Sequence, residues 1–363
     1  MSSRRAIGAV VAVTASLLLI PAAPAVAAEP EVVFSGLDNP RGLAFGPDGA
    51  LYVAEAGSGG AGPCFTGPEG EVCFGLSGSL TRFKNGEQIR VLMDLPSIAA
   101  PDGTQALGAS DVSFGKLGYL TIGLGGDPNM RADLPEGGQD MAKLFSFVPG
   151  KSTTLKPVAD IGDFEAEANP DGGVLDTNPQ SVLARDGFTV VADAGGNALL
   201  KVGKNGKIKT LAVFPQRMVD APPFLELPPG TQIPMDAVPT GVAFHEGAYY
   251  VAQLTGFPFP KGGANIFKVV PGQDPEVFAS GLTNLIDIAF DGYGDLYALE
   301  IADNTLLGEQ PSGMLLRIHP GQAPEVIASN LMMPGGLAIK DGFAYVTDCG
   351  TCVEAGRVLK IKL

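Results

Sequence analysis

The stretch Asn39-Pro-Arg-Gly-Leu-Ala-Phe-Gly-Pro-Asp-Gly-Ala-Leu-Tyr-Val-Ala-Glu55 sets the pattern of the whole chain. Its two short apolar runs, at 43–45 and 51–53, are separated by a Gly-Pro-Asp-Gly turn. Turn residues between two such runs are typical of a β-hairpin. Related phrases recur five times along the chain, and their second runs end at Leu124, Asp193, Gln253, Glu300 and Asp348. The chain therefore contains six copies of one hairpin.

Each hairpin is followed by segments that we expect to form a third and a fourth strand. The third copy shows them without insertions, as Ala198-Leu-Leu-Lys-Val, the turn Gly203-Lys-Asn-Gly, and Lys207-Ile-Lys-Thr-Leu-Ala-Val. Four antiparallel strands in repeats of about 40–50 residues are the signature of a β-propeller blade. The sequence predicts an all-β fold, a six-bladed β-propeller with four-stranded antiparallel blades.

The two ends of the chain predict how the ring closes. The fourth and fifth repeats end with Pro275-Glu-Val-Phe-Ala-Ser-Gly-Leu282 and Pro324-Glu-Val-Ile-Ala-Ser-Asn-Leu331, whereas the sixth stops at Leu363 after three strands. The missing phrase stands at the other end, as Pro30-Glu-Val-Val-Phe-Ser-Gly-Leu37. We therefore expect the N-terminal strand to complete the last blade, which leaves no open sheet edge.

The first residues have the features of a secretory signal peptide. Two arginines, at 4 and 5, precede an apolar run over 6–20, and Ala25-Val-Ala-Ala28 offers a small-residue cleavage site. The apolar run is too short to span a bilayer comfortably. We expect residues 1–28 to be removed and 29–363 to form the propeller, which is secreted or extracytoplasmic and has no membrane span; the export route, general secretory or twin-arginine, stays open.

The charge of the chain restricts its partners. With 24 Lys and Arg against 39 Asp and Glu, the formal net charge is −15. Such an acidic protein is a poor ligand for nucleic acid or an anionic membrane, and it suits cationic partners or metal ions. We expect a monomer that binds an unidentified small-molecule or protein ligand.

The four cysteines favour disulfides in an oxidising compartment. Local pairing of Cys64 with Cys73 and of Cys349 with Cys352 is the simplest of three connectivities. A zinc site built from all four is an alternative, because the first and last repeats are neighbours in a ring.

Long insertions follow the second and fourth strands of the repeats, so a propeller would place them on one face. They cover 56–78, 96–108, 124–141, 160–178, 215–238 and 254–264. Loops on a rigid scaffold commonly carry binding sites. We expect ligand contacts from Gln253, Phe257 and Phe259, with Phe224 contributing to an apolar lid. The acidic run over 160–171 is interpreted as a solvated loop, with a surface Ca²⁺ site as the alternative.

The ends of the second strands supply the candidate metal ligands. A propeller would bring them toward its axis. Carboxylate oxygens are ligands that suit Ca²⁺, the cofactor that these residues suggest. The candidate ligands are Glu55, Asp193, Glu300 and Asp348, together with Asp111 and Asp287 at the starts of innermost strands. The alternative is that these side chains bond backbone amides of nearby loops, which is common turn chemistry.

The repeated Pro-x-Gly-Leu-Ala-Phe…Asp-Gly…Leu-Tyr-Val-Ala-Glu/Asp phrase resembles the NHL and SMP-30/gluconolactonase-like six-bladed propellers. The opening Gly-Leu-Asp-Asn-Pro-Arg-Gly-Leu-Ala-Phe and the third-repeat Asn-Pro-Gln-Ser-Val resemble the exported ScyD/ScyE family. The SMP-30-like resemblance implies a divalent ion in the tunnel and lactonase activity, and the ScyD/ScyE name implies an accessory of exported pigment or secondary-metabolite assembly.

Three functions remain open at this point. The first is a non-catalytic scaffold that binds a ligand or protein on the insertion face. The second is a metal-dependent lactonase or hydrolase with axial carboxylates, and the third is the pigment accessory. With only two histidines, at 245 and 319, the chain lacks an evident nucleophile and base pair, so the scaffold is favoured.

Overall fold

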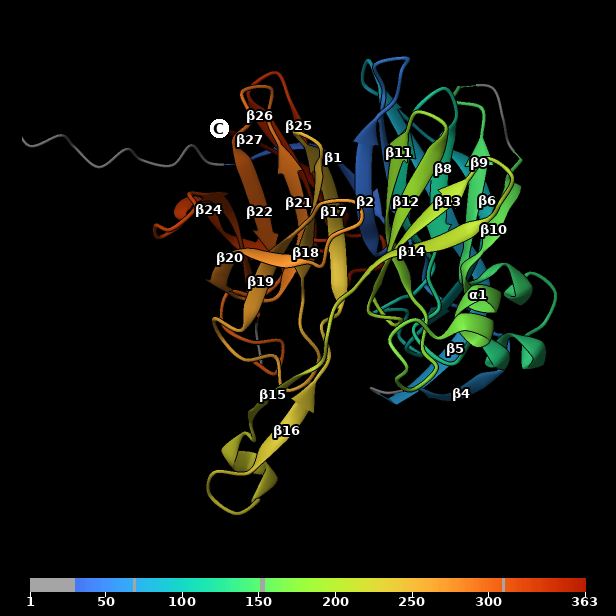
Figure 1. Cartoon of the computed structure of the whole chain (residues 1–363). Helices are drawn as coiled ribbons and strands as arrows, with labels where there is room; N and C mark the ends of the chain where they lie inside the picture. Colours follow the sequence, from blue (N-terminus) through green and yellow to red (C-terminus); the bar gives the residue numbers. More distant parts are fainter. Residues whose placement is uncertain (1–29, 68–69, 151–153, 309–310) are drawn as a thin grey trace, which may run out of the picture.

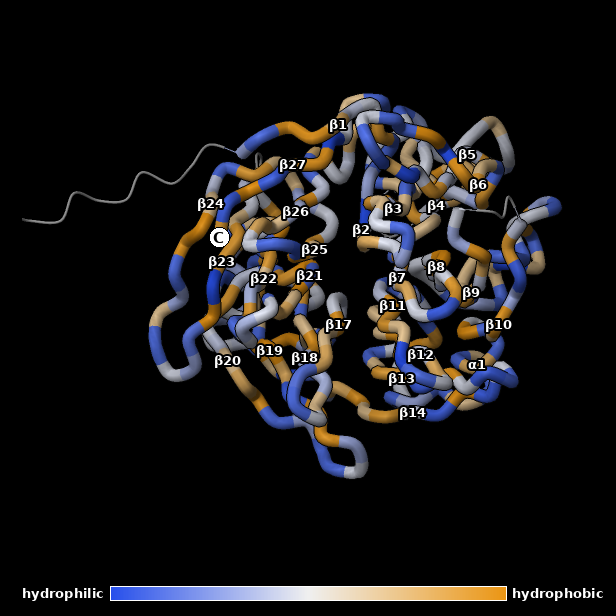
Figure 2. The backbone as a smooth tube through the Cα atoms, turned by 90° about the horizontal axis from the view of Figure 1, so that it is seen from above, coloured by the Kyte–Doolittle hydropathy of each residue, from blue (hydrophilic) through white to orange (hydrophobic). Residues whose placement is uncertain are grey.

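The computed structural model describes residues 30–67, 70–150, 154–308 and 311–363, so the predicted signal peptide lies outside the described residues. Six sheets stand around a common centre, as Figure 2 shows from above. The innermost strands, which surround that centre, are β2 (Pro40–Phe45), β7 (Ala109–Phe114), β11 (Pro179–Arg185), β17 (Pro239–His245), β21 (Leu285–Phe290) and β25 (Gly336–Lys340). We number the blades one to six in this order.

The second strands lie next to the innermost strands and contain the second apolar run of each repeat. They are β3 (Leu51–Glu55), β8 (Gly118–Ile122), β12 (Phe188–Asp193), β18 (Ala248–Gln253), β22 (Leu296–Glu300) and β26 (Phe343–Asp348). The third strands are β5 (Gly70–Lys84), β9 (Lys143–Phe147), β13 (Ala198–Gly203), β19 (Ala264–Val269), β23 (Ser312–Ile318) and β27 (Gly356–Lys362).

The outer strands complete the blades, and all pairings are antiparallel. They are β6 (Glu87–Ala99), β10 (Lys156–Asp160), β14 (Ile208–Val213), β20 (Glu276–Leu282), β24 (Glu325–Met332) and, in the last blade, β1 (Glu31–Leu37). The predicted six-bladed propeller is therefore confirmed.

The N-terminal strand β1 closes the ring as predicted. It pairs with β27, with Glu31 opposite Lys360 and Leu37 opposite Gly356. The ring of Phe34 stacks on Phe83 of blade one at 4.5 Å between centroids, and the side chain of Leu37 is fully buried. The strand is thus held in the last blade by backbone hydrogen bonds and packs against the first blade through apolar side chains.

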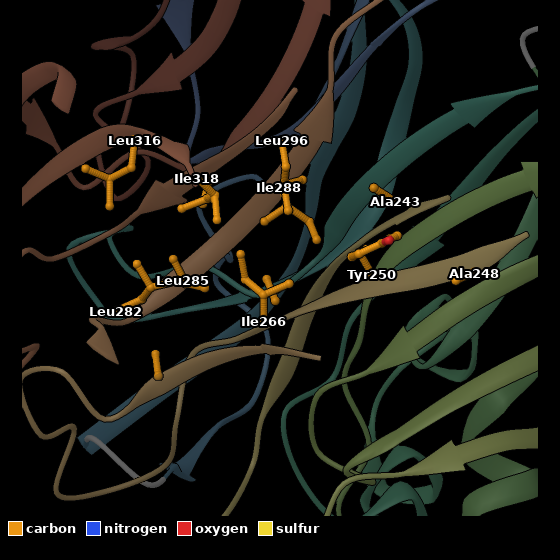
Figure 3. Packing of buried hydrophobic residues seen from close by; sticks show 13 residues of the cluster. Ala243, Ala248, Tyr250, Ile266, Leu282, Leu285, Ile288, Leu296, Leu316 and Ile318 are labelled. Carbon is orange, nitrogen blue, oxygen red and sulfur yellow. The ribbon is translucent and has the colours of Figure 1, made fainter. Parts of the chain in front are cut away.

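The core consists of the interfaces between neighbouring blades. Along β18, Tyr249 and Val251 pack toward blade three, whereas Tyr250 and Ala252 pack toward blade five. Successive side chains of a strand point to opposite faces, so a strand buried on both faces reads as a continuous apolar run. Figure 3 shows the cluster between blades four and five, with Ile266 and Ile288 among its members.

Two insertions differ from the sequence-based expectations. In blade one, β5 begins at Gly70 and pairs with a short extra strand, β4 (Cys64–Gly67). The acidic run is not a solvated loop: Ile161–Ala168 forms the helix α1, whose N-cap Asp160 accepts a hydrogen bond from the Asp163 backbone at 2.9 Å. Buried Arg131 forms ion pairs with both of these carboxylates and so neutralises the acidic start of the helix.

Smaller elements also decorate the face that carries the insertions. They are η1 (Pro128–Asp133), η2 (Gly138–Asp140), η3 (Pro223–Leu225) and the hairpin β15 (Arg217–Asp220) with β16 (Gln232–Met235). In Figure 1, α1, β4 and the β15–β16 hairpin lie on one side of the propeller, and the hairpin extends well beyond the blades. Among the described helices, none is long and apolar enough to cross a membrane.

All four cysteines are paired locally, Cys64 with Cys73 and Cys349 with Cys352. The first bond joins β4 to β5, and the second closes the turn after β26. The predicted connectivity is confirmed, and the alternative zinc site has no free thiolates from which to form.

Candidate functional site

The carboxylates at the ends of the second strands accept backbone N–H groups that lie just before the innermost strand of the same blade. Three of the donors lie in the connection that enters that strand, and the fourth, Met332, is the last residue of β24 in blade five. The donor–acceptor pairs are Asp38 to Glu55 at 2.7 Å, Asn178 to Asp193 at 2.6 Å, Thr283 to Glu300 at 2.7 Å, and Met332 to Asp348 at 2.6 Å. Four blades therefore use one local device at equivalent positions.

Arginines neutralise two of these four carboxylates. Arg90 pairs with Glu55 at 2.8 Å, and Arg357 pairs with Asp348 at 2.7 Å. Asp193 and Glu300 have no such partner among the described ion pairs. Burial raises the pKa of Asp193 to about 6 and that of Glu300 to about 7, because removal from water disfavours the charged carboxylate.

Blades two and four differ at this position. Leu124 lies two residues beyond the end of β8, and its backbone N–H donates to Asn178 Oδ1 at 3.3 Å. The amide oxygen of Gln253 is buried and accepts two hydrogen bonds from Asn265. The amide oxygen of this proposed ligand-binding residue is therefore hydrogen-bonded within blade four, and its contact with a ligand stays a prediction.

The ring of strand ends does not gather around one point. In the described part of the chain, no three of its carboxylates have oxygens within 4.8 Å of one another. Their carboxylates bond backbone N–H groups of nearby segments, which was the alternative to metal binding in the sequence analysis. Their assignment as metal ligands stays a prediction.

Asp111 and Asp287, which we call the axial pair, occupy equivalent positions on the innermost strands of blades two and five. In a six-bladed ring these blades are diametrically opposed. Both aspartates border a cavity of about 10 Å³ at the centre of the propeller, together with Ser110, Gln180 and Ser181. A cavity of that size is at the lower limit for one water molecule.

Each member of the axial pair links two adjacent blades. Asp111 accepts the N–H of Val112 and, across the blade boundary, that of Val182, each at 2.8 Å. Asp287 accepts the N–H of Ile288 at 2.8 Å and, across the blade boundary, that of Leu337 at 2.7 Å. The two halves of the ring therefore repeat the same arrangement.

The pKa of both carboxyl groups in the axial pair is raised. Burial is the main cause for each, and the charge of Asp287 adds to the effect at Asp111. The pKa of Asp287 is raised to about 7, and that of Asp111 lies well above its usual range. Ionisation of both carboxyls is therefore disfavoured near neutral pH in the absence of a bound cation.

The insertion face carries an aromatic cluster formed by Phe224, Phe257 and Phe259. Phe224 of η3 lies edge-on to Phe257 at 6.1 Å between centroids, and Phe257 lies edge-on to Phe259 at 6.4 Å. Phe224 is 61% exposed and Phe257 is 40% exposed. The structure therefore brings together the two predicted ligand-binding phenylalanines and the lid residue, away from the axis.

The geometry defines a six-bladed propeller with a narrow acidic axis and an apolar protrusion on one face. No protein-family model matches the chain, and no curated protein matches it. Solved structures match the fold. The PQQ-bound aldose sugar dehydrogenase of Streptomyces coelicolor aligns at a TM-score of 0.52 with 12% identity, covering 92% of this chain and 97% of that one.

A gluconolactonase of Xanthomonas campestris gives a TM-score of 0.51 with 12% identity, covering 94% of this chain and 99% of that one. Identities this low establish the shared propeller fold and leave activity undecided, because one fold hosts many functions. The likeness to SMP-30/gluconolactonase-like propellers is therefore shown at the level of architecture.

Sequence reasoning placed Glu165 in a solvated acidic run, with a surface Ca²⁺ site as the alternative, and missed its burial, since the residue is only 2% exposed on the inner side of α1. The available signal was Asp160 three residues before Asp163, a helix-start pattern. Recognising that helix would have separated the face of α1 that meets Arg131 from the face that carries Glu165.

Proposed function

We propose that the protein is a non-catalytic binding propeller that engages a ligand or protein partner through the aromatic cluster. The observation that supports this proposal is the exposure of Phe224 and Phe257, of which Phe224 lies in the insertion whose hairpin extends beyond the blades (Figure 1). Met218, Leu225 and Leu227 add to the exposed apolar surface of this insertion. Contiguous exposed apolar patches on otherwise polar surfaces usually mark interaction sites.

The bonding of the second-strand carboxylates supports the same proposal. A catalytic carboxylate needs a free oxygen that faces substrate, whereas Glu55 accepts bonds from Asp38, Ser79 and Arg90 within its blade. These residues stabilise a rigid scaffold on which the insertions are displayed.

We expect substitution of the aromatic cluster to weaken partner binding. The protein would be used as bait on the extracellular fraction of the source cells, and the affinity of the captured partner would then be measured by calorimetry. Phe224→Ser combined with Phe257→Ser is expected to reduce affinity roughly 30-fold or more, because buried aromatic anchors dominate interface energetics.

Tyr293→Ser is the matched control, since Tyr293 is 94% exposed in the turn between β21 and β22, away from the insertions. The control is expected to bind like the wild type. Equal binding by the double phenylalanine variant, or loss of binding in the Tyr293 variant, would contradict the proposal.

We also propose that the protein works outside the cytoplasm. The two disulfides support this location, because such bonds persist in oxidising compartments. Membership of the ScyD/ScyE family, and a role in pigment assembly, stay proposals that rest on the sequence phrases quoted above.

The axial pair favours a second candidate, a lactonase that depends on a divalent ion. Two opposed carboxylates with Ser and Gln neighbours form a hard oxygen donor set, the chemistry that Ca²⁺ prefers. Each carboxylate oxygen already accepts one backbone N–H and keeps a further lone pair. Glu55, Asp193, Glu300 and Asp348 would have to release backbone groups to act as further ligands, so this candidate depends on Asp111 and Asp287.

This second candidate predicts hydrolysis of glucono-1,5-lactone that EDTA abolishes and a divalent ion restores. Replacing the axial pair, Asp111→Asn with Asp287→Asn, is expected to lower the rate roughly 10–100-fold, whereas Glu167→Gln on the exposed side of α1 leaves it unchanged. The rate should also rise as the pH passes 7, since the pKa of Asp287 is raised to about 7 and an ion requires ionised carboxylates.

The same pKa shifts fix how stability depends on pH without metal. The native axial carboxyls keep their protons above pH 4, whereas the unfolded chain loses them. Their contribution to stability is therefore fully present below about pH 4 and is lost as the pH rises to about 7. Absence of lactone hydrolysis at every pH, with and without metal, would remove this candidate and leave the binding propeller.

A further inference from the structure

Four carboxylates gather where α1 meets the start of blade three, and we call them the blade-three acidic cluster. Its members are Glu165, Asp171, Asp176 and Asp193. Burial raises the pKa of Glu165 most, and the negative charges of Asp193, Asp171 and Asp176 raise it further. Among the described ion pairs, none joins a member of this cluster to a Lys, Arg or His.

The opposite side of the same helix provides an internal comparison. Asp160 and Asp163 are also acidic, and buried Arg131 neutralises both at 2.8–2.9 Å. Within the described residues, Arg131 is thus paired with one acidic side of α1, and no cation is paired with the other. Burying several like charges without a counter-charge is strongly unfavourable.

Three buried acceptor oxygens in this region lack a hydrogen-bond partner. They are Oε1 of Glu165, Oδ1 of Asn169 and Oδ1 of Asp176. The Glu165 side chain is 98% buried (2% exposed), and its carboxylate accepts the backbone N–H of Asp176, so it points into the loop that follows α1. Buried acceptors left unbonded are unfavourable, so a group is expected to bind them.

Two consecutive glycines allow the carboxylates to approach each other. A Cβ at Gly195 would lie 2.6 Å from Asp176 Oδ1, and one at Gly196 would lie 2.8 Å from Glu165 Oε2 and 3.3 Å from Asp193 Oδ2. Side chains at these positions would fill the space between the acidic residues. The loop that ends β12 is therefore shaped to leave room around their oxygens.

We propose that this region binds one Ca²⁺ ion, with Glu165, Asn169 and Asp176 as side-chain ligands. Oxygen-only donors of mixed carboxylate and amide type are the ligands that Ca²⁺ selects, whereas zinc sites use His or Cys. Two carboxylates supply the charge, and the Asn169 amide oxygen adds a neutral donor. Backbone carbonyls and water complete the six to eight ligands that the ion requires.

A bound proton is the competing explanation for Glu165. Protonation would neutralise one carboxylate and would satisfy at most one acceptor by donation, which leaves the oxygens of Asn169 and Asp176 unbonded. One cation contacts several oxygens at once. An ion that contacts all three oxygens would account for them together, and Glu165→Gln distinguishes the two explanations because glutamine mimics the protonated acid.

Calorimetric titration of the mature chain with CaCl₂, after EDTA treatment and dialysis, tests the site. We expect one Ca²⁺ per chain and a melting temperature that rises by about 3 °C or more in millimolar Ca²⁺, because an ion that binds only the native state raises stability. Glu165→Gln and Asp176→Asn are each expected to weaken Ca²⁺ binding roughly tenfold or more.

Glu167→Gln is the matched control, because Glu167 lies on the exposed side of the same helix. It should bind Ca²⁺ like the wild type. Failure of Ca²⁺ to bind the wild type, or equal binding by Glu165→Gln and Asp176→Asn, would overturn the proposal. Circular dichroism of each variant in EDTA would verify that it is folded.

Discussion

Deleting Glu31–Leu37 from a chain of residues 30–363 is expected to abolish its cooperative unfolding. The deletion removes the outer strand of blade six and exposes the edge of β27. It also removes Phe34 and Leu37, whose burial joins blade six to blade one. Loss of one buried phenylalanine costs about 3–5 kcal/mol and loss of one leucine about 2–5 kcal/mol, so together they approach the 5–15 kcal/mol stability of a typical domain.

Thermal unfolding followed by circular dichroism would measure this effect. Addition of a synthetic peptide of residues 30–37 provides the control, since it should restore a single transition by pairing with the free edge of β27. A truncated chain that melts sharply near the wild-type temperature without the peptide would show that β1 is dispensable for closure.

Replacing Gly42 with alanine is expected to destabilise the ring by about 3 kcal/mol or more, which is at the upper end for overpacking. The added Cβ would lie 2.0 Å from Asp111 Oδ1 and 2.9 Å from the Asp111 Cα, so the clash involves backbone as well as side chain. Blade one would have to move away from blade two, and Asp111 would lose its alignment with the Val182 N–H.

Gly241→Ala should behave in the same way, because its Cβ would lie 2.6 Å from Asp287 Oδ1 and 2.7 Å from the Asp287 Cα. Gly292→Ala is the matched control, since nothing lies within 4 Å of a Cβ at that position. Urea denaturation gives the free energies of unfolding. Variants at Gly42 or Gly241 within about 0.5 kcal/mol of the control would contradict the close approach of the innermost strands.

The sequence predicted the fold well because the information is local and repeated. The Gly-Pro-Asp-Gly turn and the apolar runs around it fix a hairpin, and six copies fix a propeller. Ring closure could also be predicted, since the phrase at Pro30–Leu37 matches the phrases that end the fourth and fifth repeats. Insertions such as α1 were less predictable, because each occurs once and has no copy with which to compare it.

The candidate site was only partly predictable, because spacing gives a residue its position in a blade and does not give its bonding partner. Glu55 and Asp348 lie at equivalent strand ends. Their partners do not, because Arg90 is in the outer strand β6 and Arg357 is in the third strand β27. Asp111 and Asp287 were identifiable because equivalent positions carry Gly or Ser. Their opposition across the axis follows because blades two and five are three positions apart in a ring of six.

The pairing of β1 with β27 also imposes an order of events on the chain. The strand made first belongs to the blade made last, so residues 31–37 must wait for residues 356–362 before they can pair. Contacts between such distant segments form slowly, because a long loop must close first. During synthesis the growing chain therefore remains an open arc, and the ring is completed only after the C-terminal blade has left the ribosome.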